Sequence, residues 1–251
     1  MFEILPIPAF KDNYIWLLLR DGYAAVVDPG DPAPVIARLE ELGFALDSIL
    51  ITHHHADHQG GVSALLEHWD AKVFGPEIES ITGRTQALRG GEVITVLGQA
   101  VQVMAVPGHT LGHLAYAVPG ALFCGDTLFG AGCGRLFEGS PAQMHESLAR
   151  IAGLPDETRV YCAHEYTEMN LRFALAVDPE NQALLARVKR VAALRDADQP
   201  SVPSTLAEEK ATNPFLRCAD PAVIAKALEL GAVDSDPVAA FTAIRHWRNS
   251  F

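Results

Sequence analysis

The stretch Ser48-Ile-Leu-Ile-Thr-His-His-His-Ala-Asp-His58 places an apolar run directly before a cluster of metal-type side chains. Its last six positions hold four histidines and one aspartate, far more than an ordinary polar loop carries. Because side chains alternate along an extended chain, His53, His55 and Asp57 are expected to point to one side and His54 to the other. We interpret the stretch as a strand that ends in a metal-binding loop. A histidine-rich loop without a specific metal is the alternative.

Three further predicted strand ends carry the same residue types. They are the ends at Val106, Cys124 and Cys162, which precede His109, Asp126 and His164. One Asp or His after a strand is weak evidence, because such residues often form turns or caps. Together, however, the four strand ends supply a large set of candidate ligands: His53, His55, Asp57, His58, His109, Asp126 and His164. This set exceeds the needs of one four-coordinate ion, so it predicts two metals that share a bridging carboxylate, and its nitrogen and oxygen donors suit zinc, iron or manganese.

Composition places the chain among globular proteins. It has 251 residues, of which 49% are hydrophobic and 20% charged. A net charge of -12 argues against a nucleic-acid binder, which needs a basic face. No apolar stretch reaches the length of a membrane span, and we find no secretory signal, so a cytoplasmic location is expected. The four cysteines form no C-x-x-C pair and are expected to be buried reduced thiols.

The pattern of the first two thirds predicts an α/β domain in layers. Short apolar runs between turn residues predict strands over 2–7, 14–19, 23–27, 72–74, 92–96, 99–106, 114–118, 121–124 and 159–162. Pro and Gly signals predict helices over 31–43 and 140–152. After residue 164 no strand is expected, and Asp-Pro pairs predict helix starts at 178, 220 and 236, with a capping box at 205–208. We therefore expect two domains, 1–165 and 166–251.

The order T-H-x-H-x-D-H with later His, Asp and His resembles the signature of the metallo-β-lactamase superfamily. Longer motifs resemble the glyoxalase II (hydroxyacylglutathione hydrolase) family over essentially the whole chain: GDTLFGAGCGRLFEG at 125–139, YCAHEYTE at 161–168, STLAEE at 204–209 and NPFLR at 213–217. This resemblance implies a four-layered αββα sandwich followed by a small all-helical C-terminal domain.

The resemblance also implies how the ligands are shared between the metals. One metal would be held by His53, His55 and His109, the other by Asp57, His58 and His164, and Asp126 would bridge them. Asp57 and Asp126 would in addition orient a bridging hydroxide. Zinc is the first expectation for both metals, with iron or manganese as alternatives, because His/Asp sites accept all three.

Substrate-binding residues are implied at Arg135, Phe137, Tyr166, Arg245 and Arg248. The last two are three positions apart on a predicted helix and therefore share a face, and arginine suits carboxylate binding. A solvated helix face is the alternative for this pair. Some relatives have Tyr at the position of Phe137 and Lys at those of Arg135 or Arg248, so a hydroxyl contact to the substrate is expected to be lost at Phe137.

The expected reaction is hydrolysis of S-(2-hydroxyacyl)glutathione, foremost S-D-lactoylglutathione, to glutathione and D-lactate, the second step of methylglyoxal detoxification. Two metals would acidify a shared water and stabilise the oxyanion. A thiolate, with a reference pKa of about 8.5, leaves without strong help from an acid. The alternatives are a glutathione persulfide dioxygenase of the same fold and a non-catalytic metal-binding protein. We expect a monomer that binds neither nucleic acid nor membrane.

Overall fold

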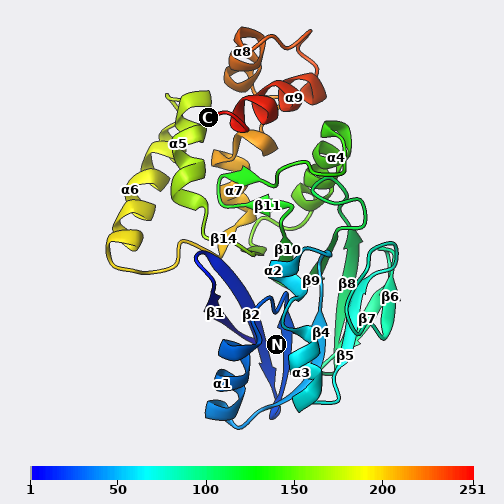
Figure 1. Cartoon of the computed structure of the whole chain (residues 1–251). Helices are drawn as coiled ribbons and strands as arrows, with labels where there is room; N and C mark the ends of the chain where they lie inside the picture. Colours follow the sequence, from blue (N-terminus) through cyan, green and yellow to red (C-terminus); the bar gives the residue numbers. More distant parts are fainter. Residues whose placement is uncertain (1) are drawn as a thin grey trace. The chain divides into compact units, whose positions relative to one another are not determined.

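The computed structural model describes residues 2–251, and the chain divides into two compact units (Figure 1). The N-terminal unit holds the residues up to 105 together with 112–125. The C-terminal unit holds 106–111 together with 126–251. The predicted domain boundary after residue 165 stays a prediction.

The first sheet of the N-terminal unit has six strands in sequential order. They are β1 (Glu3–Ala9), β2 (Asn13–Arg20), β3 (Tyr23–Val27), β4 (Ala45–Leu50), β5 (Lys72–Pro76) and β6 (Gln86–Leu88). The first three strands pair antiparallel, whereas β3 to β6 pair parallel. Because β3 and β4 run in the same direction, Asp28 and Thr52, which follow them, emerge at one edge of the sheet.

Four antiparallel strands complete the N-terminal unit. They are β7 (Val93–Val96), β8 (Gln99–Ala105), β9 (Leu114–Val118) and β10 (Ala121–Gly125). Both β8 and β10 are antiparallel to β9 and therefore run in the same direction as each other. The chain consequently leaves β8 toward His109 and β10 toward Asp126 at the same edge.

Three helices accompany these strands: α1 (Pro32–Leu42), α2 (Ala56–Gln59) and α3 (Val62–His68). As predicted, α1 is capped by the side chain of Asp31, which accepts from the amide of Ala33, and ends at Gly43 with φ +70. The apolar faces of α1 and α3 pack on β1 to β5 in one buried cluster (Figure 1). This packing fixes the strands whose ends carry the candidate ligands.

The C-terminal unit is mainly helical. Its elements are β11 (Leu128–Phe129), β12 (Gly132–Cys133), α4 (Pro141–Ala152), β13 (Arg159–Cys162), α5 (Thr167–Val177), α6 (Gln182–Asp196), β14 (Ser204–Thr205), α7 (Leu206–Thr212), the 3-10 helix η1 (Pro214–Leu216), α8 (Pro221–Glu229) and α9 (Pro237–Arg248). The predicted start of α4 is confirmed by a reciprocal capping box between Ser140 and Gln143. The predicted starts of α8 and α9 are confirmed by the caps Asp220 and Asp236.

Two predictions for this unit were wrong. Asp178 does not begin a helix but ends α5, and α6 is capped instead by Asn181, whose side chain accepts from the amide of Leu184. The Asp-Pro pair misled because an aspartate before proline also suits the end of a helix. The region after residue 164 is not free of strands, since β14 pairs antiparallel with β13.

The cysteine and membrane predictions can also be compared with the structure. All four cysteines are buried and free of disulfides, as expected. Within residues 2–251, no helix combines the length and the apolar character needed to cross a membrane.

Candidate metal centre

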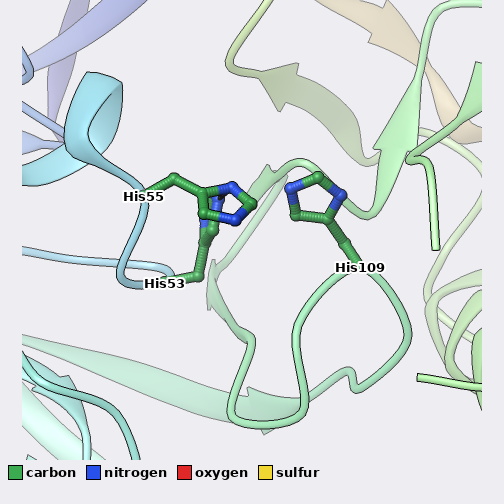
Figure 2. Close-up of side chains that lie close together, drawn as sticks. All are labelled: His53, His55 and His109. Atoms are coloured by element: carbon green, nitrogen blue, oxygen red, sulfur yellow. Dashed lines mark hydrogen bonds between the residues drawn. The ribbon is translucent and has the colours of Figure 1, made fainter. Parts of the chain in front are cut away.

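The loop after β4 brings His53 and His55 together in the N-terminal unit. The Nε2 atom of His53 lies 2.9 Å from Nδ1 of His55, and the ring centroids are 4.6 Å apart. Figure 2 shows the two imidazoles side by side on this loop. His53 is fully buried. The expectation that these two side chains share a side is confirmed.

The expectation of an extended chain was wrong for this loop, because the chain bends at residues 52–54 after β4 has ended at Leu50. Asp57 and His58 lie on α2, a single helical turn, so they do not continue the strand alternation. The turn still places the two side chains close together, with Nε2 of His58 3.5 Å from Oδ2 of Asp57. Asn13 donates a hydrogen bond of 3.1 Å to the same carboxylate oxygen.

Asp28 fixes the positions of candidate ligands in the N-terminal unit, a role that the sequence analysis did not predict. Its buried carboxylate accepts hydrogen bonds from the amide and hydroxyl of Thr52, at 2.8 and 2.7 Å, and from Nδ1 of His58 at 3.0 Å. The hydroxyl of Thr52, which donates to Asp28, in turn lies 3.0 Å from Nδ1 of His53 and accepts from it. Both rings are therefore protonated at Nδ1, and Nε2 carries the lone pair that can bind a metal.

A second centre of candidate ligands lies in the C-terminal unit around Asp126. One carboxylate oxygen is 3.4 Å from Nε2 of His109 and the other is 3.3 Å from Nε2 of His164. All three side chains are at least nine-tenths buried. One carboxylate whose two oxygens face two different imidazoles has the donor arrangement expected of a bridging ligand.

The ring of His109 is anchored through its Nδ1 atom, as are the rings of His53 and His58. Its Nδ1 lies 2.7 Å from the carbonyl oxygen of Arg135, which can only accept, so Nε2 again carries the lone pair (Figure 2 draws this ring). His164 stacks on Tyr166 with a centroid distance of 4.7 Å and an angle of 5°. The imidazole and carboxylate donors of both units fit zinc, iron or manganese, and contain no thiolate.

Other histidines play different parts. The amide of His54 donates to the carboxylate of Glu79 at 2.7 Å, which ties down the loop backbone. His113 is fully buried and stacks on His53 at 4.6 Å, a contact that sequence reasoning missed. His145 packs edge-on against Phe241 in the C-terminal unit.

The C-terminal unit also contains a cavity of about 370 Å³. Its lining includes Arg135, Tyr166, Arg245 and Arg248. Nη1 of Arg245 donates to the carbonyl of Cys133 at 3.1 Å, and burial together with the charge of Arg245 lowers the pKa of Arg248. A guanidinium whose pKa is lowered by burial and by a neighbouring positive charge favours an anionic partner.

Among the described residues that line this cavity, Phe137 is absent. Phe137 is 60% exposed as a residue. Its ring centroid lies 5.2 Å from that of His109, edge-on, and the guanidinium of Arg135 lies 5.4 Å over the ring. It thus offers an apolar surface next to a candidate ligand.

Known families match the chain along nearly its whole length. A model of the metallo-beta-lactamase superfamily matches residues 10–164, and a model described as the hydroxyacylglutathione hydrolase C-terminus matches residues 165–251. The hydroxyacylglutathione hydrolase of Dechloromonas aromatica is 65% identical, and that of Methylobacillus flagellatus 53%, each over 100% of both chains.

Solved structures agree with this assignment. The crystal structure of ETHE1 from Myxococcus xanthus superposes with a TM-score of 0.69 at 26% identity, covering 99% of this chain and 91% of that one. The crystal structure of TTHA1623 in a di-iron-bound form has a TM-score of 0.56 at 30% identity, covering 64% of this chain and 91% of that one.

The chain therefore belongs to the metallo-β-lactamase superfamily and has its fold, followed by a helical C-terminal region. Within that superfamily it is a member of the hydroxyacylglutathione hydrolase family, the thioester hydrolases also called glyoxalase II. The resemblance inferred from the sequence is confirmed. Its clusters of His and Asp fit a binuclear metal site.

Proposed function

We propose that this chain hydrolyses S-(2-hydroxyacyl)glutathione, with S-D-lactoylglutathione as its main substrate, to glutathione and D-lactate in the second step of methylglyoxal detoxification. The observation that carries the proposal is the 65% identity to a hydroxyacylglutathione hydrolase over the full length of both chains. We also propose that the protein is a monomer and acts in the cytoplasm. The proposed boundary between its two domains lies after residue 165.

The proposed ligand sets follow the family assignment: His53, His55 and His109 for one metal, Asp57, His58 and His164 for the other, and Asp126 for both. Zinc is proposed for the pair, with iron or manganese as alternatives. Two bound divalent ions would lower the pKa of a water molecule to near neutrality and polarise the thioester carbonyl. Support comes from the carboxylate of Asp126, whose two oxygens face two imidazoles.

The residues of the chain would contribute orientation and substrate binding. Asp57 and Asp126 would accept hydrogen bonds from the attacking water and so fix the direction of its lone pair. Arg135, Arg245 and Arg248 would bind the carboxylates of the glutathione moiety, and Tyr166 would contribute its hydroxyl. The thiolate of glutathione can leave without a general acid, because the reference pKa of a cysteine thiol is about 8.5.

Phe137 stands where some family members have tyrosine, and we propose that it contacts the substrate through its ring alone. Its exposed position beside His109 supports such a contact.

The test is an ultraviolet assay of thioester loss from S-D-lactoylglutathione by the metal-loaded protein. An oxygen electrode with glutathione persulfide is run on the same sample. Thioester loss without oxygen uptake supports the hydrolase. Oxygen uptake without thioester loss would support the persulfide dioxygenase, and neither activity would support a non-catalytic metal-binding protein.

Asp28→Asn is expected to lower metal affinity by roughly 10- to 100-fold, the usual effect of losing the hydrogen-bond partner of a ligand. The amide cannot serve all three donors that the carboxylate of Asp28 accepts, so the rings of His53 and His58 lose their fixed orientation. Asparagine tolerates the φ of +53 at this position, so the backbone is not expected to change. Metal affinity is measured by competition with a chromogenic chelator.

Asp21→Asn is the matched control, because Asp21 has a similar φ of +51 but an exposed side chain. It is expected to bind metal as the parent does. Equal affinities for all three proteins would contradict the orienting role of Asp28.

A further inference from the structure

The carboxylate of Glu209 is fully buried and receives four hydrogen-bond donors in the C-terminal unit. Oε1 accepts from the hydroxyl of Ser204 at 2.7 Å and from the guanidinium of Arg187. Oε2 accepts from the amide of Ala131 at 2.9 Å and from the side-chain amide of Asn213 at 3.1 Å. Ser204, Glu209 and Asn213 belong to the family motifs in the C-terminal region, but none of them lines the cavity or offers a metal ligand.

The charge of Glu209 is balanced inside the fold. Arg187 is 1% exposed, and although burial alone would lower its pKa, the carboxylates of Glu209 and Glu208 outweigh this effect and raise the pKa. A carboxylate can accept at all four of its lone-pair positions, whereas an amide must present two N–H groups. Only an ionised acid can therefore satisfy the four donors that converge here.

Two of these donors connect Glu209 to the β11–β12 hairpin. Ala131, whose amide binds Oε2, sits at the hairpin turn with φ +54, an uncommon conformation for alanine. Asn213 also donates to the carbonyl of Gly132 at 2.9 Å. From α5, Asn170 donates to the carbonyl of Gly130 at 3.1 Å. Side chains from α7 and α5 thus hold the turn in addition to the pairing of its own two short strands.

Both strands of the same hairpin form part of the cavity wall. The carbonyl of Cys133 accepts the hydrogen bond from Arg245, and Cys133 and Phe129 both line the cavity. The ring of Phe129 lies edge-on to Tyr166 at 5.3 Å. A shift of the hairpin would therefore move the group that orients Arg245 and the ring beside Tyr166.

We propose that Glu209, together with Asn213, is a positioning residue for substrate binding, which holds the β11–β12 hairpin where Cys133 orients Arg245 toward the glutathione carboxylate. This inference rests on the proposed thioesterase function. It assigns a role to the STLAEE and NPFLR motifs, which hold the β11–β12 hairpin that forms part of the cavity wall without lining the cavity themselves.

Glu209→Gln is expected to raise KM for S-D-lactoylglutathione by roughly tenfold while kcat changes by less than about threefold, because the displaced guanidinium acts in binding and not at the reacting carbonyl. Metal content should equal that of the parent. Glu208→Gln is the matched control: Glu208 also contacts Arg187 but makes no hydrogen bond to the hairpin among the described residues, so its KM should stay at the parent value.

Asn213→Ser supplies a second variant in case the buried amide introduced by Glu209→Gln prevents folding. Serine keeps an oxygen that can cap η1, as Asn213 now does by accepting from the amide of Phe215, but it loses the side-chain NH2 group that donates to Gly132, and its single hydroxyl sits on a shorter side chain. Its KM should rise in the same way. A KM within about twofold of the parent for the folded variants, with only a lower melting temperature, would overturn the proposal.

The coupling to Arg245 separates positioning from general loss of stability. In an Arg245→Met background, Glu209→Gln should raise KM no further, since the group that it positions has been removed. A full additional tenfold increase would contradict the proposed route. The Kd of glutathione is measured by calorimetry on all these proteins. A parent protein that binds glutathione but leaves the thioester intact would refute the proposed thioesterase function. The Kd values of the variants for glutathione would still test the positioning role of Glu209.

Discussion

Asp126→Asn is expected to reduce both the metal content and the thioesterase turnover of the protein by roughly 100-fold or more, since even partners one step removed from a ligand are worth about 10- to 100-fold. Both oxygens of Asp126 face imidazoles, those of His109 and His164. Asparagine keeps the shape but replaces one oxygen by an N–H donor and removes the charge. A bridging role requires both oxygens, so the loss should affect both metals.

The measurement is metal content by mass spectrometry together with kcat on S-D-lactoylglutathione. Asp156→Asn is the matched control, because Asp156 is an exposed aspartate of the same unit that pairs only with Lys210 among the described contacts. It should keep full metal content and turnover. Full turnover and full metal content in Asp126→Asn would show that this carboxylate does not bridge.

Arg245→Met should raise KM for the glutathione thioester by roughly 30-fold or more with metal content unchanged, because loss of one partner of a buried charge pair costs about 2 kcal/mol or more. Methionine retains an apolar stem of similar volume, which limits the packing loss. Arg245 is 5% exposed, and its position against the carbonyl of Cys133 directs the guanidinium at the cavity. The effect should therefore appear in binding.

Arg172→Met is the control for Arg245→Met. Arg172 is 73% exposed on α5 and pairs with Glu168, so its loss should leave KM at the parent value. A parent-like KM in Arg245→Met, with the variant folded and loaded with metal, would exclude Arg245 from substrate binding.

The sequence predicted the starts of four helices from their caps, because a cap is a local interaction between neighbouring residues. Asp31, Ser140, Asp220 and Asp236 all cap helices where expected. The two-residue strands β11, β12 and β14 were not predicted. They are too short to show a period-two pattern, and their positions depend on tertiary contacts such as that between Ala131 and Glu209.

The candidate ligands could be found from the sequence because each follows a strand. Asp28 also follows a strand, and that signal was present but not used. Its role depends on the parallel pairing of β3 and β4, which brings it to Thr52 and His58, and pairing between distant strands cannot be read from a local pattern. Similarly, the helical turn of α2 was missed because a four-residue helix has no periodicity.

The central claim is that two metals share the ligands of this chain and support thioester hydrolysis. Its most direct test is the number of zinc, iron and manganese ions per chain, determined by mass spectrometry on the same sample that is assayed on S-D-lactoylglutathione. We expect about two metals per chain, a turnover that falls when a chelator removes them, and recovery on reloading. Full thioesterase activity in a sample with only one metal per chain would contradict the binuclear site.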